Sequence, residues 1–292
     1  MIGIGLRTVH FTEILRDQPK VDFFEAISEN FMDSGGRPSF ILDKIAERYP
    51  IVLHGVSMNI GSADSLDFDY LRKLKALAKR VNARWLSDHL CWTGVGGRNT
   101  HDLLPMPYNE ESLNHVANRV VAVSDFLGAP LVLENASSYA EFTTSTMTEW
   151  DFLARLVALT GCKLLLDVNN VYVSAYNHGF DPKTYIDAIP RGSVAQYHLA
   201  GHTNHGTHIV DTHIGPVIDE VWSLYAYALD RLGDEPWTLL EWDAEIPDFA
   251  TVHAEAMKAS AVRAQWGAGA SPARTGEGAG APLSNEAETI HA

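Results

Sequence analysis

Lys163-Leu-Leu-Leu-Asp-Val-Asn-Asn170 joins a short apolar run to an abruptly polar end. Such a run is typical of a β-strand that is buried on both faces, as in a parallel sheet. Comparable candidate strands recur along the chain at Ile2–Arg7, Asp22–Ile27, Ile51–Val56, Trp85–Leu90, Pro130–Ala136, Lys163–Asn169, Val194–Ala200 and Trp237–Asp243. Longer stretches with helical patterns separate them, among them Tyr70–Val81 and Glu110–Leu127. Strands that alternate with helices predict an α/β fold with a parallel sheet.

The number of strand–helix units predicts a (β/α)₈ TIM barrel, which takes about 250 residues. An open, doubly wound sheet is the less economical alternative. The pattern ends near Trp266, so we predict a catalytic barrel domain over residues 1–266. The segment Gly267–Ala292 is rich in Gly and Ala and has no aromatic residue, and we expect it to be disordered.

Composition excludes several classes of protein. The chain has 22 Lys and Arg against 37 Asp and Glu, a net charge of −15, which argues against binding to a nucleic-acid backbone. No apolar stretch approaches the roughly 18 residues that span a membrane. Two cysteines, Cys91 and Cys162, are too few for a disulfide framework or a thiolate zinc site, which favours a reducing cytoplasm. We expect both to be buried or inert.

Metal-binding or proton-transferring residues stand at the carboxyl ends of most predicted strands. Ile51-Val-Leu-His54 is one example and Leu131-Val-Leu-Glu-Asn135 is another. These ends meet at the mouth of a TIM barrel, where its chemistry takes place. Asp211-Thr-His213 adds two donors in an extended segment. The candidate metal ligands are His54, His89, Glu134, Asp167, Asn170, His198, Asp211, His213 and Glu241.

These donors are all nitrogen or oxygen atoms, without a thiolate. One metal ion takes four to six ligands and a carboxylate can bridge two ions, so the set indicates two or three metals. Glu25 and Glu29, which follow the second strand, either reach the mouth or serve as helix caps or salt-bridge partners. The histidines of the loop Gly201–Ile209 either face a substrate or are solvated.

Motifs spread over the chain resemble, in order, those of the DUF692 (UPF0276) family of multinuclear non-heme iron-dependent oxidative enzymes, which includes the methanobactin maturase. The motifs are His54-Gly-Val-Ser57, Ser87-Asp-His-Leu90, Leu104-Pro-Met-Pro-Tyr108, Leu133-Glu-Asn-Ala-Ser-Ser-Tyr139, Leu166-Asp-Val-Asn-Asn170, Tyr197-His-Leu-Ala-Gly-His202, Asp211-Thr-His213 and Leu240-Glu-Trp-Asp243. The resemblance extends from Gly3 to about Gln265.

The resemblance implies a TIM barrel with two or three irons in mixed Fe(II)/Fe(III) states and O₂ as co-substrate. It also implies modification of cysteine residues in a ribosomally made precursor peptide, which a separate partner protein presents. The family's ligand pattern falls on the candidate ligands above, with Asp243 and Asn135 as nearby candidates. Glu134, as the bridge between irons, and Asp243 are the predicted catalytic residues. We expect Gly94–Pro107 and Gly201–Ile209 to border the mouth and contact the peptide.

The alternative is a metal-dependent hydrolase or isomerase of the endonuclease IV and xylose isomerase-like type. In those barrels a zinc cluster hydrolyses DNA at abasic sites, or divalent metals assist sugar isomerisation. Asn170 stands where the zinc nucleases typically carry a histidine, and an amide oxygen favours a harder metal such as iron. A metal-dependent binding module is a third, weaker hypothesis, because open coordination positions at a barrel mouth favour catalysis.

Overall fold

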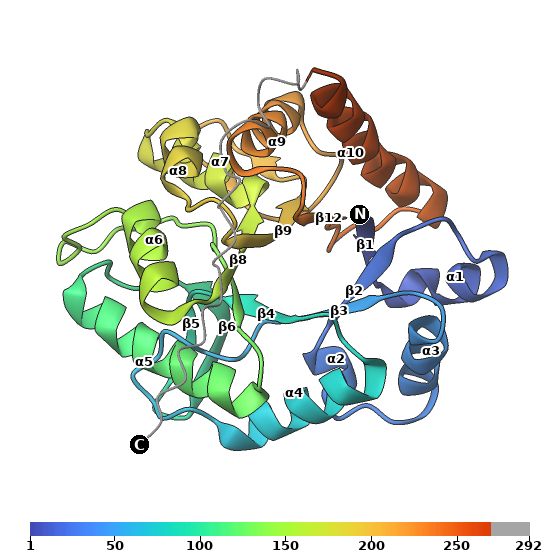
Figure 1. Cartoon of the computed structure of the whole chain (residues 1–292), viewed down its shortest axis with the longest axis horizontal. Coiled ribbons are helices and arrows are strands. Elements are labelled where there is room, and N and C mark those ends of the chain that lie inside the picture. Colours follow the sequence, from blue (N-terminus) through green and yellow to red (C-terminus); the bar gives the residue numbers. More distant parts are fainter. Residues whose placement is uncertain (270–292) are drawn as a thin grey trace, which may run out of the picture.

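The structure is a computed structural model that describes residues 1–269. The barrel strands are β1 (Ile2–Gly5), β2 (Phe23–Ile27), β3 (Ile51–Gly55), β4 (Leu86–His89), β7 (Val132–Glu134), β8 (Lys163–Asp167), β9 (Val194–Leu199) and β12 (Trp237–Leu240). They close in the order β1-β12-β9-β8-β7-β4-β3-β2, with neighbours parallel (Figure 1). The predicted TIM barrel is thereby confirmed. Each predicted strand is present, and all eight are shorter than predicted.

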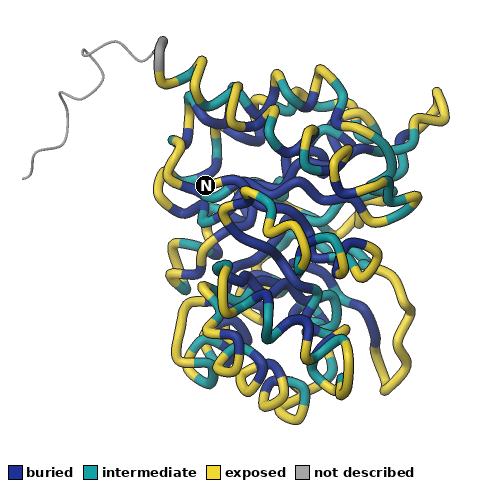
Figure 2. Tube along the Cα trace, turned by 90° about the vertical axis from the view of Figure 1, so that its right-hand side faces the viewer, coloured by how far each residue is buried: buried dark blue, intermediate teal, exposed yellow. Residues whose placement is uncertain are grey.

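Helices surround the barrel (Figure 1). They are α1 (Phe11–Asp17), α2 (Glu29–Met32), α3 (Gly36–Ala46), α4 (Phe68–Val81), α5 (Glu110–Leu127), α6 (Glu149–Thr160), α7 (Val168–His178), α8 (Pro182–Ala188), α9 (Asp219–Leu232) and α10 (Phe249–Gly269). The predicted N-cap of α5 is present, since Asn109 Oδ1 accepts the Ser112 N–H at 3.0 Å. Figure 2 shows the buried strands at the centre and the exposed turns outside.

The interior of the barrel is layered. Phe23, Val52 and Leu239 form a small apolar cluster of their own, packed against Trp85 and Trp237. Side chains two residues apart point to the same face of a strand. The next inward positions on β2, β3 and after β12 therefore lie directly above this apolar layer, toward the carboxyl ends of the strands. Those positions are occupied by Glu25, His54 and Glu241.

Two segments predicted as loops are hairpins instead. β5 (Trp92–Val95) pairs with β6 (Arg98–Leu104) after β4, and β10 (Thr203–Asn204) pairs with β11 (Ile209–Val210) after β9. Both follow the carboxyl end of a barrel strand, so both belong to the mouth side. Gly201, between β9 and β10, allows a close approach, because a Cβ there would lie 2.3 Å from the Ile214 carbonyl oxygen. This contact brings the segment after Asp211-Thr-His213 against β9.

The predicted domain end also differs slightly. α10 continues to Gly269, past the predicted limit at Trp266. The rest of the predicted disordered segment, residues 270–292, lies outside the described residues. Among residues 1–269, no helix combines the length and the apolar character needed to cross a membrane.

Candidate metal centre

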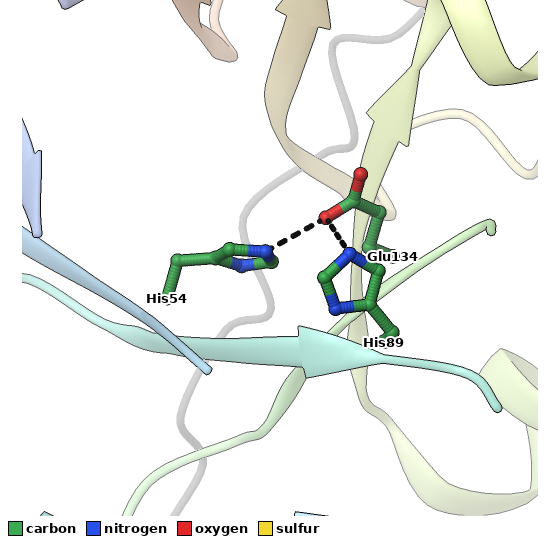
Figure 3. Close-up of side chains that lie close together, drawn as sticks. All are labelled: His54, His89 and Glu134. Carbon is green, nitrogen blue, oxygen red and sulfur yellow. Dashed lines mark ion pairs between the residues drawn. The ribbon is translucent and has the colours of Figure 1, made fainter. Parts of the chain in front are cut away.

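The carboxyl ends of the strands bring most of the predicted ligands together at one mouth. The first group is His54 from β3, His89 from β4 and Glu134 from β7 (Figure 3). Glu134 Oε2 lies 3.1 Å from His54 Nε2 and 3.3 Å from His89 Nε2. The other ring nitrogens are held from behind: His54 Nδ1 lies 2.9 Å from Ser87 Oγ and His89 Nδ1 3.1 Å from the Gly55 carbonyl oxygen. Both imidazoles therefore aim Nε2 at one point.

A second group lies deeper in the mouth and shares Glu134 with the first. It adds Asp167 from β8, His198 from β9 and Glu241 after β12, all buried. His198 Nδ1 is 3.0 Å from Glu241 Oε2 and 3.7 Å from Glu134 Oε1. Asp167 also caps α7, since its Oδ1 accepts the Asn170 N–H at 2.6 Å. Its Oδ2 lies 4.0 Å from His198 Nδ1.

A third group shares Glu241 with the second and consists of His213, Glu241 and Asp243. His213 Nδ1 lies 3.3 Å from Glu241 Oε2 and 3.1 Å from Asp243 Oδ2. The His213 backbone is left-handed, with φ of 48°, a conformation that is uncommon for residues with a Cβ. Such an outlier indicates that the surrounding contacts determine the position of the ring.

Two predicted ligands, Asn170 and Asp211, border these groups. Asn170 Nδ2 donates to the Asn135 carbonyl oxygen at 3.0 Å, which leaves Oδ1 for the mouth. Asp211 Oδ1 lies 2.9 Å from His213 Nε2, and Ser137 Oγ donates to its Oδ2 at 3.2 Å. Asn135, a further candidate, is engaged elsewhere, because its side chain hydrogen-bonds the backbone N–H and carbonyl of Asp167.

Buried polar atoms without a hydrogen bond concentrate at this mouth. A buried polar atom without a hydrogen-bond partner is costly and needs an explanation. Within the described residues, those at the mouth are Glu134 Oε2, Asp167 Oδ2, Asn170 Oδ1, His198 Nδ1 and His213 Nε2. Each of these atoms belongs to a predicted ligand and lies near the ligand atoms of other candidate residues, an arrangement that fits bound cations. The donor set is also right for a metal, because it combines imidazole, carboxylate and amide groups.

The pKa values of the buried residues at the mouth are shifted because several ionisable groups lie close together there. Burial raises the pKa of Glu134 well above its usual value, although His198 opposes the shift, and burial raises the pKa of Asp167 to about 7. Burial alone would lower the pKa of His198, but the carboxylates of Glu25, Glu134 and Glu241 raise it well above the usual value. In the metal-free chain, protons and imidazolium groups thus balance the carboxylate charge. Divalent cations would take over that role.

Sequence reasoning missed Arg7 and left Glu25 undecided. The Arg7 guanidinium, which follows β1, forms ion pairs with Asp243 and with Glu241 Oε1, the latter at 3.3 Å. The position of Arg7 after a predicted barrel strand could have indicated from the sequence that it lies at the mouth. Glu25 Oε1 lies 3.2 Å from His198 Nε2, so it belongs to the mouth network. Glu29 instead accepts hydrogen bonds from Tyr70 and the Val56 N–H.

The histidines of the β10–β11 hairpin divide into two kinds. His202 Nδ1 lies 2.7 Å from Asn169 Oδ1, and Asn169 Nδ2 donates to Asp211, so His202 supports the mouth indirectly. His205 and His208 are exposed and stack on each other at 5.0 Å. Cys91 is buried, and burial raises the pKa of its thiol well above the usual value, in agreement with an inert side chain.

Two cavities lie among segments that follow β3, β4 and β7, and none of the candidate ligands lines either of them. One has a volume of about 660 Å³ and is lined in part by Gly61, Trp92 and His115. The other, of about 380 Å³, is lined in part by Ser138, the neighbour of Ser137, which bonds Asp211. Met106 and Phe142 line both cavities.

Comparison with known proteins agrees with this geometry. Residues 1–264 match the model of a family described as the RiPP precursor modification enzyme MbnB/TglH/ChrH. The chain belongs to this family. UPF0276 proteins are among its relatives: one from Caulobacter vibrioides is 52% identical over 268 residues (91% of this chain, 94% of the relative). Another, from Anaeromyxobacter, is 50% identical over 262 residues (90% and 92%). The resemblance to DUF692/UPF0276 is thereby confirmed.

Solved structures support the barrel fold of this MbnB/TglH/ChrH family member. An L-ribulose 3-epimerase aligns with a TM-score of 0.61 at 16% identity, covering 96% of this chain and 99% of the epimerase. Endonuclease IV from Thermus thermophilus aligns with a TM-score of 0.59 at 16% identity, covering 90% and 98%. At these identities the likeness concerns the fold alone. The family is one of enzymes that modify RiPP precursors. In this chain, the clustered His and carboxylate groups could hold metal ions.

Proposed function

We propose that this protein is an iron- and O₂-dependent enzyme that modifies cysteine residues of a ribosomally made precursor peptide. Two or three irons bind at the barrel mouth, and a separate partner protein presents the peptide. The observation that carries the proposal is the chain of three donor groups joined by two shared carboxylates, Glu134 and Glu241. Family membership supplies the class of substrate.

The proposed ligands fall into three metal positions. One metal is held by His54, His89 and Glu134. The next is held by His198 and Asp167, which lie between the two shared carboxylates. His213 with Glu241 holds the outermost position, where Asp211 and Asp243 are the further carboxylates. Asn170 Oδ1, buried and without a hydrogen bond, is an additional ligand for the deeper positions. Bound iron supplies one-electron and O₂ chemistry, which the side chains of the barrel do not.

Residues around the metals orient the substrate and remove water. The outermost group is the most accessible, since Asp243 is exposed to 41% while His198 is fully buried. The substrate cysteine therefore enters from the side of Asp243, whose carboxylate is the proton acceptor for the thiol. The two cavities and the β5–β6 and β10–β11 hairpins are the surfaces that contact the flanking peptide.

A metal-dependent hydrolase or isomerase of the endonuclease IV type is the second candidate, because the fold is similar. Two features disfavour it: the net charge of −15 repels a phosphate backbone, and Asn170 provides an amide instead of an imidazole.

One experiment separates the two. Fe(II)-loaded protein is incubated in air with the Cys-containing peptide encoded beside its gene and any partner protein encoded there, and the peptide mass is measured. We expect a mass change that requires O₂ and is absent from a Cys→Ser peptide. Cleavage of abasic-site DNA with an unmodified peptide would contradict the proposal.

A further inference from the structure

Glu25 lies inside the barrel, directly above the apolar layer of Phe23, Val52 and Leu239 and next to the proposed metal ligands. The residue is 1% exposed, and both carboxylate oxygens already have partners. Oε1 is 3.2 Å from His198 Nε2, and Oε2 accepts a hydrogen bond from Gln196 Nε2 at 2.6 Å. With both oxygens engaged in this way, Glu25 belongs to none of the three donor groups. Glu25 is therefore placed to act on His198, and not to bind a metal itself.

The two ring nitrogens of His198 have different surroundings. Nδ1 faces Glu241 Oε2 at 3.0 Å and Glu134 Oε1 at 3.7 Å, and it makes no hydrogen bond. Nε2 faces the opposite way, where it lies 3.2 Å from both oxygens of Glu25 and 2.9 Å from the Gln196 amide nitrogen. An amide NH₂ group cannot accept a proton, so the Glu25 carboxylate is the acceptor available to an Nε2 proton. Only Nδ1 can meet a cation held by Glu134 and Glu241. Coordination through Nδ1 requires that the proton of the neutral ring be on Nε2, where a carboxylate accepts it.

The orientation of Gln196 fixes Glu25 in turn. The indole N–H of Trp85 donates to Gln196 Oε1 at 3.0 Å. An indole nitrogen is only a donor, so the amide oxygen must face Trp85 and the amide nitrogen must face Glu25. Gln196 is fully buried, which leaves its amide no solvent partner in another orientation. A series of contacts from Trp85 through Gln196 thus holds the Glu25 carboxylate next to His198 Nε2.

We propose that Glu25 is a positioning residue of the metal centre: its carboxylate accepts the Nε2 proton of His198 and directs the ring to bind metal through Nδ1. The inference rests on the proposed function, because it takes the donor groups as a metal site. A carboxylate behind a metal-binding histidine fixes the ring and increases its basicity, and loss of such a partner typically reduces metal affinity by about 10- to 100-fold.

The first test measures Fe(II) affinity without O₂, by competition with a chromogenic chelator. We expect Glu25→Gln to weaken the affinity by about 10- to 100-fold, because the amide is a poorer acceptor for the imidazole proton. Glu29→Gln is the matched control, since Glu29 lies just after β2, near Glu25 in the chain, but bonds Tyr70 and the Val56 N–H instead. Its affinity should equal that of the wild type. Equal affinity in Glu25→Gln would overturn the proposal.

Exchanging the carboxylate and amide of Glu25 and Gln196 tests whether Glu25 acts through its charge on His198 or only through packing. The double variant Glu25→Gln/Gln196→Glu moves the carboxylate to the place of the Gln196 amide, whose nitrogen lies 2.9 Å from His198 Nε2. We expect the exchange to restore most of the Fe(II) affinity. If it stays as weak as Glu25→Gln, the carboxylate does not act through His198. Should Glu25→Gln not fold, the double variant alone decides, with near-wild-type affinity as the supporting result and a tenfold or larger loss as the contradicting one.

A spectroscopic measurement tests the ring directly. In Zn(II)-loaded protein labelled with ¹⁵N-histidine, long-range NMR correlations should show His198 protonated at Nε2 and metal-bound at Nδ1. Metal binding through Nε2 would overturn the inference while leaving the metal centre intact. Wild-type protein that binds no iron at all would instead refute the proposed function.

Discussion

Glu134→Gln is the most informative single substitution, because Glu134 belongs to two of the three donor groups. The change keeps the shape of the side chain but replaces one ligand oxygen by an NH₂ group without a free lone pair. Burial already raises the pKa of Glu134, so the metal-free wild type favours the neutral carboxyl. We therefore expect the metal-free variant to be about as stable as the metal-free wild type, and the loss to appear only with metal.

The size of the effect follows from linkage. Free iron at 100 times its Kd stabilises the folded wild type by about 2.7 kcal/mol for each site that it fills. At about 2–4 °C per kcal/mol for a protein of this size, the thermal midpoint rises by about 5–10 °C for each site. Anaerobic thermal unfolding with and without Fe(II), together with elemental analysis, should show a much smaller rise in Glu134→Gln than in the wild type, because only the third donor group lacks Glu134.

The control for Glu134→Gln is His115→Ala. His115 lies in the wall of the larger cavity, with Nε2 2.8 Å from the Ser62 carbonyl oxygen, and contacts none of the donor groups. Its iron content and its iron-dependent rise in midpoint should match the wild type, even if the variant is less stable overall. A Glu134→Gln protein that keeps the wild-type iron content and the full thermal shift would refute the role of Glu134 as a shared ligand.

Three further predictions concern the same mouth and its surroundings. Protein purified without O₂ should contain about two to three Fe per chain, whereas zinc alone, without iron-dependent activity, would favour a hydrolase. Asp211→Ala should lose iron and turnover because it removes the carboxylate 2.9 Å from His213 Nε2; unchanged iron content would limit Asp211 to a supporting role. Burial raises the pKa of Glu149 from 4.5 to about 7, so folding stability should fall as the pH rises through that interval. Glu149 alone should contribute no more than about 1.4 kcal/mol per pH unit to this fall, and Glu149→Gln should remove that contribution in denaturant unfolding of the metal-free protein.

Most of the fold could be predicted because the barrel strands are apolar runs with polar ends, a pattern that depends only on local sequence. The errors lie where polar side chains redirect the backbone. The predicted strand through Asn169 ends at Asp167, because that carboxylate caps α7 and starts a helix at Val168. The β5–β6 hairpin also had a local signal, the pair Gly96-Gly97, which adopts φ of 61° and 71° in the turn.

Most candidate ligands could be proposed from the sequence because they stand at or next to the carboxyl end of a barrel strand, as His54, Glu134 and Asp167 do. Their pairing could not, since it joins distant parts of the chain. His198 and Glu25 are 173 positions apart, and Arg7 and Asp243 are 236 apart. A carboxylate after an apolar strand looks the same in sequence whether it binds a metal or accepts a proton from a ligand. Only the closed barrel brings Glu25 to 3.2 Å from His198 Nε2, the contact on which we base the second role.

Because two carboxylates are shared between donor groups, substitutions of different ligands should affect the metal centre to different extents. His54 contributes to one donor group, whereas Glu134 and Glu241 each contribute to two. Loss of His54 therefore weakens one metal position directly, but loss of either shared carboxylate weakens two and removes a negative charge that holds neighbouring cations together. Glu241 is further tied to Arg7, whose guanidinium already satisfies part of its charge. Because Arg7 would compete with a cation for Glu241 and Asp243, we expect the outermost position to bind metal more weakly than the two that share Glu134.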